Sequence, residues 1–182
     1  MNALSKQIMN QSDQQSSDAS ALPKCLIVVY SYHHNNTAKI AQALSEVLMA
    51  QIKTPDQIVQ EELADYDLIG FGAGIAGGKH YRPLLDLIDG FEPIIAASQD
   101  SQQKCFIFST SAIISAEKIF NDHTALRDKL VSKGFSVIDE FSCRGLNTNS
   151  FLKFFGGMGR GRPNAEDLDN ARKFAHTVLE KI

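Results

Sequence analysis

The sequence lacks the cysteine patterns that mark metal-binding or disulfide-stapled proteins. It has no CxxC pair, and its three cysteines, Cys25, Cys105 and Cys143, lie far apart along the chain. No metal-ligand spacing is present, so no metal site is expected. Cys25 and Cys105 fall in apolar runs, where a free cysteine behaves as a small hydrophobic residue. We therefore expect reduced thiols and a cytoplasmic location.

Long apolar runs and strong charge are missing as well. No run approaches the length needed to span a bilayer, so no membrane partner is expected. The net charge of −3 gives no sign of a nucleic-acid surface. The 182 residues suggest one domain. Residues 1–22 are polar and lack the apolar core of a signal peptide, which predicts a poorly ordered tail before a domain over residues 23–182. A short helix around Leu4–Met9 is the alternative.

The remaining chain alternates buried strands with amphipathic helices. Continuous apolar runs are typical of strands buried on both faces of a parallel sheet. The predicted strands are Cys25–Tyr30, Gln51–Thr54, Asp67–Gly72, Lys104–Ser109 and Phe135–Phe141. Helical spacing follows from Asn36, over Pro83–Ile88, over Glu117–Lys133 and from about Asn164, with a final buried stripe of Leu168, Ala171, Ala175, Val178 and Ile182. This order predicts an α/β fold, a three-layer, doubly wound parallel sheet.

Polar and small residues follow the ends of the predicted strands. Loops beginning at Ser31, Gly72, Ser109 and Ser142 are each rich in Ser, Thr, Asn or Gly. Ligands of open parallel sheets bind at the carboxyl ends of the strands, so these loops are expected to build one site. Glu61–Tyr66 is expected to be a turn or a short helix.

The first of these loops, Ser31–Thr37, has the features of an anion site. It joins a buried strand to a helix start, where unpaired N–H groups and the helix dipole favour a negative charge. GxxxxGK[ST] is absent, and the loop has no Lys or Arg, so a single phosphate is more suitable than a triphosphate with magnesium. His33 and His34 are either phosphate contacts or solvent-facing side chains.

A second glycine pattern, Gly72–Gly77, matches GxGxxG directly after a strand. A dinucleotide fingerprint belongs to the first strand–helix unit, and this one follows the third predicted strand. Gly78 and Pro83 delay the helix that should begin within the motif. We interpret Ala73–Gly78 as a loop whose glycines allow a close approach to a flat ligand, or simply a turn.

The Ser31–Thr37 loop, SYHHNNT, resembles the phosphate loop of the flavodoxin-like family, which reads roughly [ST]-x-T-G-N-T. It is one residue longer, and Asn35 stands where glycine is usual; Asn is the most tolerant other residue for a left-handed backbone. The resemblance extends to Tyr66–Gly72, to Ser109–Ser111 and to the final helix after residues 161–163, covering about residues 24–182. It implies a five-stranded sheet of order 2-1-3-4-5 that binds flavin mononucleotide (FMN).

The same resemblance implies a set of cofactor-binding residues. The phosphate would lie on Ser31–Thr37, and the flavin ring between the Ala73–Lys79 and Thr110–Ala112 loops. The basic and aromatic group Lys79, His80, Tyr81 and Arg82 would touch the flavin edge or the phosphates of a nicotinamide donor, or is simply a solvated helix start. Within it, Lys79 would tune the flavin by its positive charge. The full set is Ser31, His33, His34, Asn35, Asn36, Thr37, Gly72, Ala73, Gly74, Ile75, Lys79, Ser109, Thr110, Ser111 and Ala112.

Several departures from electron-carrier flavodoxins guide the functional hypothesis. Such carriers usually stack the ring on Trp and Tyr and are strongly acidic, whereas this chain has no Trp and a net charge of −3. An FMN-binding oxidoreductase is favoured, with NAD(P)H as candidate donor and a quinone-type compound as acceptor. An electron carrier between redox proteins and a non-redox binding module are the alternatives, and a homodimer is compatible with either. No catalytic residue is assigned.

Two further groups of residues in the sequence could suggest a function. Ser109, Ser111 and His123 do not make a hydrolase triad, because there is no GxSxG elbow and the sequence identifies no placed carboxylate. The loop Arg144–Arg162 carries Phe151, Phe154 and Phe155 and is interpreted as a lid, a dimer contact or a partner patch, or as Phe side chains that fold back onto the sheet.

Overall fold

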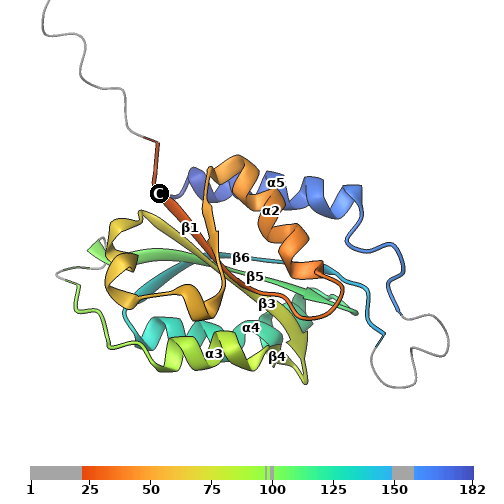
Figure 1. Ribbon diagram of the computed structural model, residues 1–182, viewed down its shortest axis with the longest axis horizontal. Coiled ribbons are helices and arrows are strands. Elements are labelled where there is room, and N and C mark those ends of the chain that lie inside the picture. Colours follow the sequence, from red (N-terminus) through yellow and green to blue (C-terminus); the bar gives the residue numbers. More distant parts are fainter. Residues whose placement is uncertain (1–21, 97, 99–100, 149–157) are drawn as a thin grey trace, which may run out of the picture.

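The computed structural model describes residues 22–96, 98, 101–148 and 158–182 (Figure 1). Most of the predicted tail, its alternative short helix and the phenylalanines at positions 151, 154 and 155 lie outside the described residues. Among the described helices, none combines the length and the apolar character that crossing a bilayer requires.

A parallel sheet forms the centre of the molecule. Its strands are β1 (Cys25–Tyr30), β2 (Gln51–Lys53), β3 (Leu68–Ala76), β5 (Gln103–Ser111) and β6 (Phe135–Arg144), in the spatial order β2-β1-β3-β5-β6. The two-residue strand β4 (Lys79–His80) pairs antiparallel with β3. Counting the parallel strands alone, this is the predicted order 2-1-3-4-5, and the α/β fold class is confirmed.

Helices cover both faces of the sheet (Figure 1). Helices α2 (Asn36–Leu48) and α5 (Ala165–Leu179) lie on one face, and α3 (Arg82–Asp89) and α4 (Ala116–Ser132) on the other. Two short 3₁₀ helices, η1 (Pro55–Gln57) and η2 (Gln60–Asp65), precede β3. The strands divide the apolar residues between the two faces: Leu26 and Val28 join the α3–α4 core, and Ile27 joins the α2–α5 core. The predicted three layers are therefore present.

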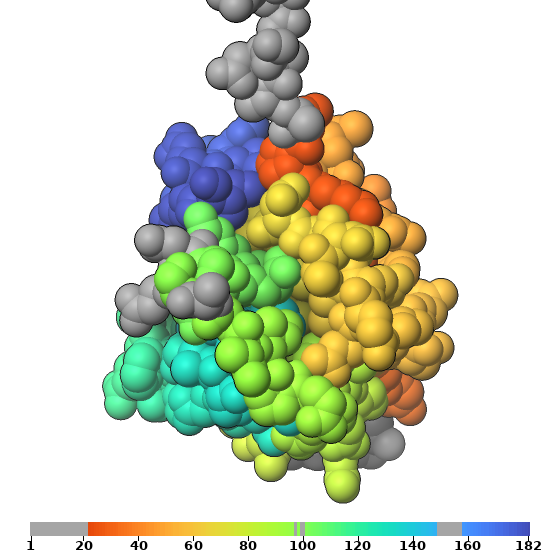
Figure 2. Space-filling model, turned by 90° about the vertical axis from the view of Figure 1, so that its left-hand side faces the viewer, coloured from red at the N-terminus to blue at the C-terminus, as the bar shows by residue number. Residues whose placement is uncertain are grey.

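The chain ends of the folded part lie at the amino edge of the sheet. Figure 2 looks at this edge, where the red start of β1 lies beside the blue end of α5. The opposite, carboxyl edge carries the β1–α2 connection and the β3–β4 turn (Figure 1). Candidate ligand-binding loops and chain ends are thus on opposite sides.

One predicted loop is wrong in the structure. Residues Ala73–Ala76 continue β3, because Ala73 and Gly74 pair with strand β5 and Ala73 also pairs with β1. Gly77 and Gly78 then form a two-residue turn with φ values of 59° and 77°, the left-handed conformation that glycine adopts without strain. The small residues of this stretch therefore build a hairpin with β4.

Smaller differences concern the ends of elements. Strands β5 and β6 extend past the predicted ends at Ser109 and Phe141, to Ser111 and Arg144. Ile182 was predicted in the buried stripe of the last helix but is 38% exposed, because α5 ends at Leu179. Leu168 is only partly buried.

Candidate functional site

A small cleft opens at the carboxyl edge of the sheet, where β1, β3, β5 and β6 end. Its enclosed space amounts to about 40 Å³. A single water needs about 10–15 Å³ of such space, so the cleft accommodates a group of roughly phosphate size. The lining residues are Ser31, Tyr32, His33, Asn36, Thr37, Gly74, Ile75, Tyr81, Thr110, Ser111, Ala112, Gly145, Leu146 and Asn147.

The loop between β1 and α2 presents backbone N–H groups at this cleft. His34 and Asn35 both have left-handed backbones, with φ values of 55° and 53°, and Asn35 is the N-cap of α2. This is the conformation for which asparagine is suited. The N–H of Ala38 donates to Ser31 Oγ at 3.2 Å, whereas the N–H groups of Asn35 and Thr37 form no hydrogen bond within the described part of the chain. The first turn of α2 carries no acidic side chain, so its positive dipole end is available to an anion.

Two side chains fix the start of α2 against neighbouring strands. The hydroxyl groups of Thr37 and Thr110 lie 2.8 Å apart and are buried, which joins α2 to β5. Asn36 Nδ2 donates to the Leu146 carbonyl at 2.8 Å, while its Oδ1 is buried without a hydrogen-bond partner in the described part of the chain. A Cβ on Gly145 would lie 2.8 Å from Asn36 Nδ2, so glycine is needed there. The floor of the cleft therefore contains an unused acceptor.

The two adjacent histidines have different positions. His34 Nε2 lies 2.8 Å from Thr148 Oγ1, outside the cleft. The His33 ring lines the cleft and lies beside Tyr32 and Tyr81. Only His33 is therefore placed to meet a ligand directly.

An aromatic cluster stands at the rim of the cleft. The ring of Tyr81 lies 5.9 Å from that of Tyr30 and 6.5 Å from that of Tyr32, both edge-on. A Cβ on Gly74 would approach Tyr81 Cε2 to 2.8 Å, so the glycine makes room for this ring. Neither Tyr32 nor Tyr81 is among the fifteen residues expected to bind the cofactor. The signal available for Tyr81 was the Gly77–Gly78 pair, which predicts the tight turn that folds β4 back.

Of the fifteen residues expected to bind a cofactor, the cleft brings together nine: Ser31, His33, Asn36, Thr37, Gly74, Ile75, Thr110, Ser111 and Ala112. The others do not line it. Gly72 is buried in β3, where a Cβ would lie 2.2 Å from the Phe108 ring, so packing accounts for this glycine. Ala73 lies within the sheet, His34 and Asn35 are on the outside of the loop, and Lys79 lines a separate groove.

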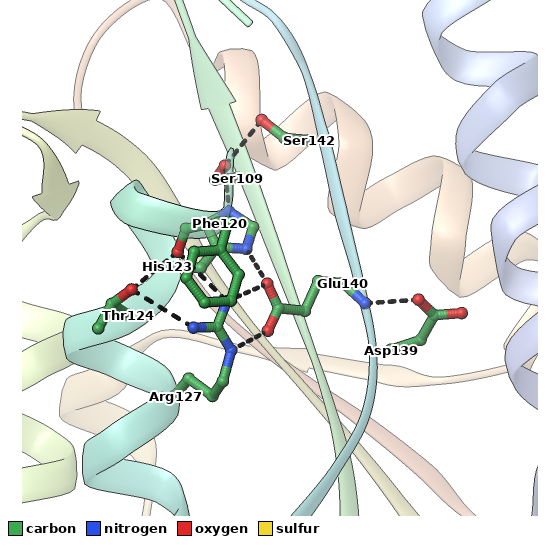
Figure 3. Close-up of polar contacts among 8 residues, drawn as sticks. All are labelled: Ser109, Phe120, His123, Thr124, Arg127, Asp139, Glu140 and Ser142. Carbon is green, nitrogen blue, oxygen red and sulfur yellow. Dashed lines mark hydrogen bonds and ion pairs between the residues drawn. The ribbon is translucent and has the colours of Figure 1, made fainter. Parts of the chain in front are cut away.

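Ser109 belongs to a buried polar network on the α4 side of the sheet (Figure 3). Its Oγ lies 2.8 Å from His123 Nε2, and His123 Nδ1 lies 2.9 Å from Glu140 Oε2. The sequence alone does not identify a carboxylate beside His123; in the structure β6 supplies Glu140. Ser109 is nevertheless only 1% exposed and His123 is fully buried, so no acyl group can reach the hydroxyl. The network is the interior of a fold rather than a hydrolase centre.

Hydrogen bonds within this network keep the carboxyl group of Glu140 ionised. Partial burial raises the pKa of Glu140, but hydrogen bonds from His123 and Arg127 outweigh that effect and lower it to about 2. Arg127 Nη2 donates to Glu140 Oε2 at 2.8 Å. Because Glu140 is ionised, His123 donates its Nδ1 proton to the carboxylate.

His80 lies beside the network but is not part of it. Its ring centroid is 4.9 Å from that of His123, it is 1% exposed, and neither ring nitrogen has a hydrogen-bond partner among the described residues. Burial, reinforced by His123, lowers the pKa of His80 to about 3. His80 is therefore neutral at physiological pH.

Comparison with known proteins places this architecture in a class. The fold matches solved flavodoxins: a flavodoxin from the domain Archaea, with 16% identity over 87% of this chain and 97% of that chain and a TM-score of 0.60, and Flavodoxin 2 from Bacillus cereus, with 20% identity over 87% and 99% and a TM-score of 0.62. No family model matches the sequence. The fold is flavodoxin-like.

A closer relative is known from sequence. The uncharacterized protein MJ0298 of Methanocaldococcus jannaschii is 39% identical over 157 residues, which cover 86% of this chain and 99% of that protein. The chain belongs to the same family as this archaeal protein.

Proposed function

We propose that this protein binds FMN at the carboxyl edge of its sheet and acts as a flavin-dependent oxidoreductase. The observation that carries the proposal is the phosphate-sized cleft at the start of α2. At this helix start the backbone N–H groups of Asn35 and Thr37 have no hydrogen-bond partner among the described residues, and the helix dipole favours an anion. The absence of Lys and Arg from Ser31–Thr37 suits one phosphate group.

The unpaired acceptor Asn36 Oδ1 narrows the choice of ligand further. Asn36 Oδ1 cannot exchange places with Nδ2, because Nδ2 is held by the Leu146 carbonyl. A buried acceptor without a donor costs about 1–3 kcal/mol, which a ligand hydroxyl next to the phosphate would relieve. FMN carries its phosphate on a polyhydroxyl chain and so offers both groups.

The flavin ring, by contrast, does not fit within the enclosed space of about 40 Å³. It must extend beyond the cleft past Tyr32 and Tyr81, whose aromatic surfaces suit a flat ligand. When bound, FMN would supply the electron-transfer chemistry, and the chain's residues would bind and orient it. Flavodoxins among the solved structures of the same fold support this choice of cofactor.

The donor and acceptor that we propose are NAD(P)H and a quinone-type compound. A net charge of −3 offers little electrostatic steering towards a redox protein, which favours small substrates over a carrier role. The three cysteines are free and buried, which agrees with a reducing, cytoplasmic compartment. NAD(P)H oxidation with a quinone by the FMN-loaded protein would support the reductase; its absence would favour the carrier.

The phosphate assignment is tested by Thr37→Val with Thr177→Val as the matched control. Thr37 is 2% exposed in the cleft, whereas Thr177 is an exposed residue of α5. A hydrogen bond to a charged group contributes about 1.5–3 kcal/mol, so Thr37→Val should weaken FMN binding by about tenfold or more, measured by calorimetry. Thr177→Val should bind as the wild type does. Equal affinities in both variants would remove Thr37 from the site.

A further inference from the structure

A short hairpin lies beside the cleft and is only lightly attached to the sheet. This β4 hairpin, Ile75–Tyr81, consists of the end of β3, the turn at Gly77 and Gly78, and β4, which pairs only with the last two residues of β3. It lies off the main path of the sheet and packs against α4 (Figure 1). A groove of about 460 Å³ borders it on the α3 side. The hairpin therefore has open space beside it into which it can move.

His80 is the only buried residue of the β4 hairpin. Ile75 and Tyr81 are partly exposed, the four residues from Ala76 to Lys79 are exposed, and His80 is 1% exposed. The His80 ring lies against that of His123 of α4, but neither of its nitrogens has a hydrogen-bond partner among the described residues. Burial of unpaired nitrogens costs stability. One buried side chain, with its polar atoms unsatisfied, thus anchors the hairpin to α4.

The charged groups on the elements around His80 are paired with one another, apart from the exposed Lys79, so none of them bonds the His80 ring. They are His123, Asp122, Lys118, Arg127 and Lys129 of α4, Glu140 of β6, Lys79 of β4, and Arg82, Asp86 and Asp89 of α3. Burial, reinforced by His123, outweighs the attraction of the Phe108 carbonyl and of Glu140 and lowers the pKa of His80 to about 3. The closed hairpin therefore holds this ring neutral.

We propose that the β4 hairpin is a pH-sensitive gate of the cleft, which neutral His80 holds shut and protonated His80 opens. Tyr81 follows His80 directly, lines the cleft, and donates its N–H to the Gly74 carbonyl at 3.1 Å. When the hairpin lifts from α4, the His80 ring reaches water and Tyr81 leaves the cleft. The rest of the sheet stays folded, because β1, β3 up to Gly74, β5 and β6 keep their pairing. The gate goes beyond the proposed function, and its first test needs no ligand.

The size of the pH effect follows from the exposure of the ring on opening. The ordinary pKa of 6.5 applies to His80 in the open hairpin, and the value of about 3 in the closed one. Between these values only the open state binds the proton, so its population is smallest above about pH 6.5 and grows below. From about pH 7.5 to about pH 5, linkage raises that population about 30-fold. His80→Phe keeps an anchor of similar shape that no proton can release.

Amide hydrogen exchange of the protein without ligand measures this opening. The protection of the Tyr81 N–H, corrected for the intrinsic exchange rate at each pH, should fall about 30-fold from about pH 7.5 to about pH 5 and stay constant in His80→Phe. The Ile107 N–H of the central strand β5 should stay better protected by about tenfold or more. Equal protection of the two amides, or a pH effect that persists in His80→Phe, would overturn the inference.

Two further variants test His80 as the anchor. His80→Ala removes the buried ring, so at pH 7.5 the Tyr81 N–H should lose protection by about tenfold or more, with no further loss at pH 5 and with native amide signals elsewhere. His176→Phe changes an exposed histidine of α5 and should behave as the wild type does. Wild-type protection of Tyr81 in His80→Ala would show that other contacts hold the hairpin and would refute the gate.

The rate of FMN release tests whether the gate controls the cleft. The ratio of the release rates at pH 5 and pH 7.5 should be about 30-fold larger in the wild type than in His80→Phe. Effects of pH on His33 and on the FMN phosphate are common to both proteins and cancel in this comparison. Equal ratios would overturn the gate. A protein that binds no FMN would instead defeat the proposed function and leave the exchange result standing.

Discussion

Acidification should destabilise the protein through His80, and the size of the effect follows from its burial. The ordinary pKa of 6.5 applies in the unfolded chain, and the folded pKa is about 3. Between these values the unfolded state binds a proton that the folded state excludes, so stability is complete above about pH 6.5 and declines below it. From about pH 7.5 to about pH 5, linkage gives a loss of about 2 kcal/mol in the free energy of unfolding.

Substitution of His80 by Phe isolates this contribution. Phe has a similar shape, cannot take up a proton and removes two unpartnered buried nitrogens. Urea unfolding followed by circular dichroism should show that His80→Phe is more stable than the wild type and lacks about 2 kcal/mol of its pH dependence. Glu140 does not confuse the comparison, because its folded pKa of about 2 and ordinary value of 4.5 lie below this window.

His176→Gln, a change at an exposed histidine of α5, serves as the control and should keep the wild-type pH dependence. The reasoning fails if His80→Phe and the wild type lose the same free energy between the two pH values. That result would mean that His80 takes up its proton within the folded protein, and so is hydrated or paired.

Other substitutions test the packing around the site. Glu140→Gln should lower the free energy of unfolding by about 2 kcal/mol at neutral pH, because it leaves Arg127 without its ion-pair partner in a half-buried position; urea unfolding would show this, and an unchanged midpoint would contradict it. Gly72→Ala should cost about 1–3 kcal/mol, because the new Cβ would lie 2.2 Å from the Phe108 ring. Gly90→Ala, whose Cβ would be 3.4 Å from its nearest neighbour, should cost much less, and similar melting temperatures for the two variants would refute the packing argument.

Most of the fold could be predicted because its strands are buried on both faces. The first five residues of the run Cys25–Tyr30 are apolar and buried, and the run forms β1 with the same bounds. The structure of Ala73–Gly78 was harder to predict from the sequence. Small residues and glycines are typical of loops. Ala73 and Gly74 are strand residues because they pair with β1 and β5, which are distant in sequence, and Ile75 and Ala76 because they pair with β4.

The candidate site likewise contains residues that the sequence predicts and contacts that it does not. Thr37 and its loop were predictable because a strand, a polar turn and a helix start are adjacent in sequence. Tyr81 reaches the cleft only through the hairpin turn, and Glu140 reaches His123 only because β6 lies beside β5. The Gly77–Gly78 pair indicates the turn but not where the Tyr81 ring lies, and the contact of Glu140 has no local signal, so each depends on the tertiary fold.

The central claim is that the cleft at the start of α2 recognises the phosphate of FMN. The most direct measurement is a titration of the wild-type protein with FMN and, in parallel, with riboflavin, which has the same ring and hydroxyl chain but no phosphate. Flavin fluorescence and calorimetry should show one FMN bound per chain, about tenfold or more tighter than riboflavin. Equal affinities for the two flavins, or no binding of either, would contradict the account.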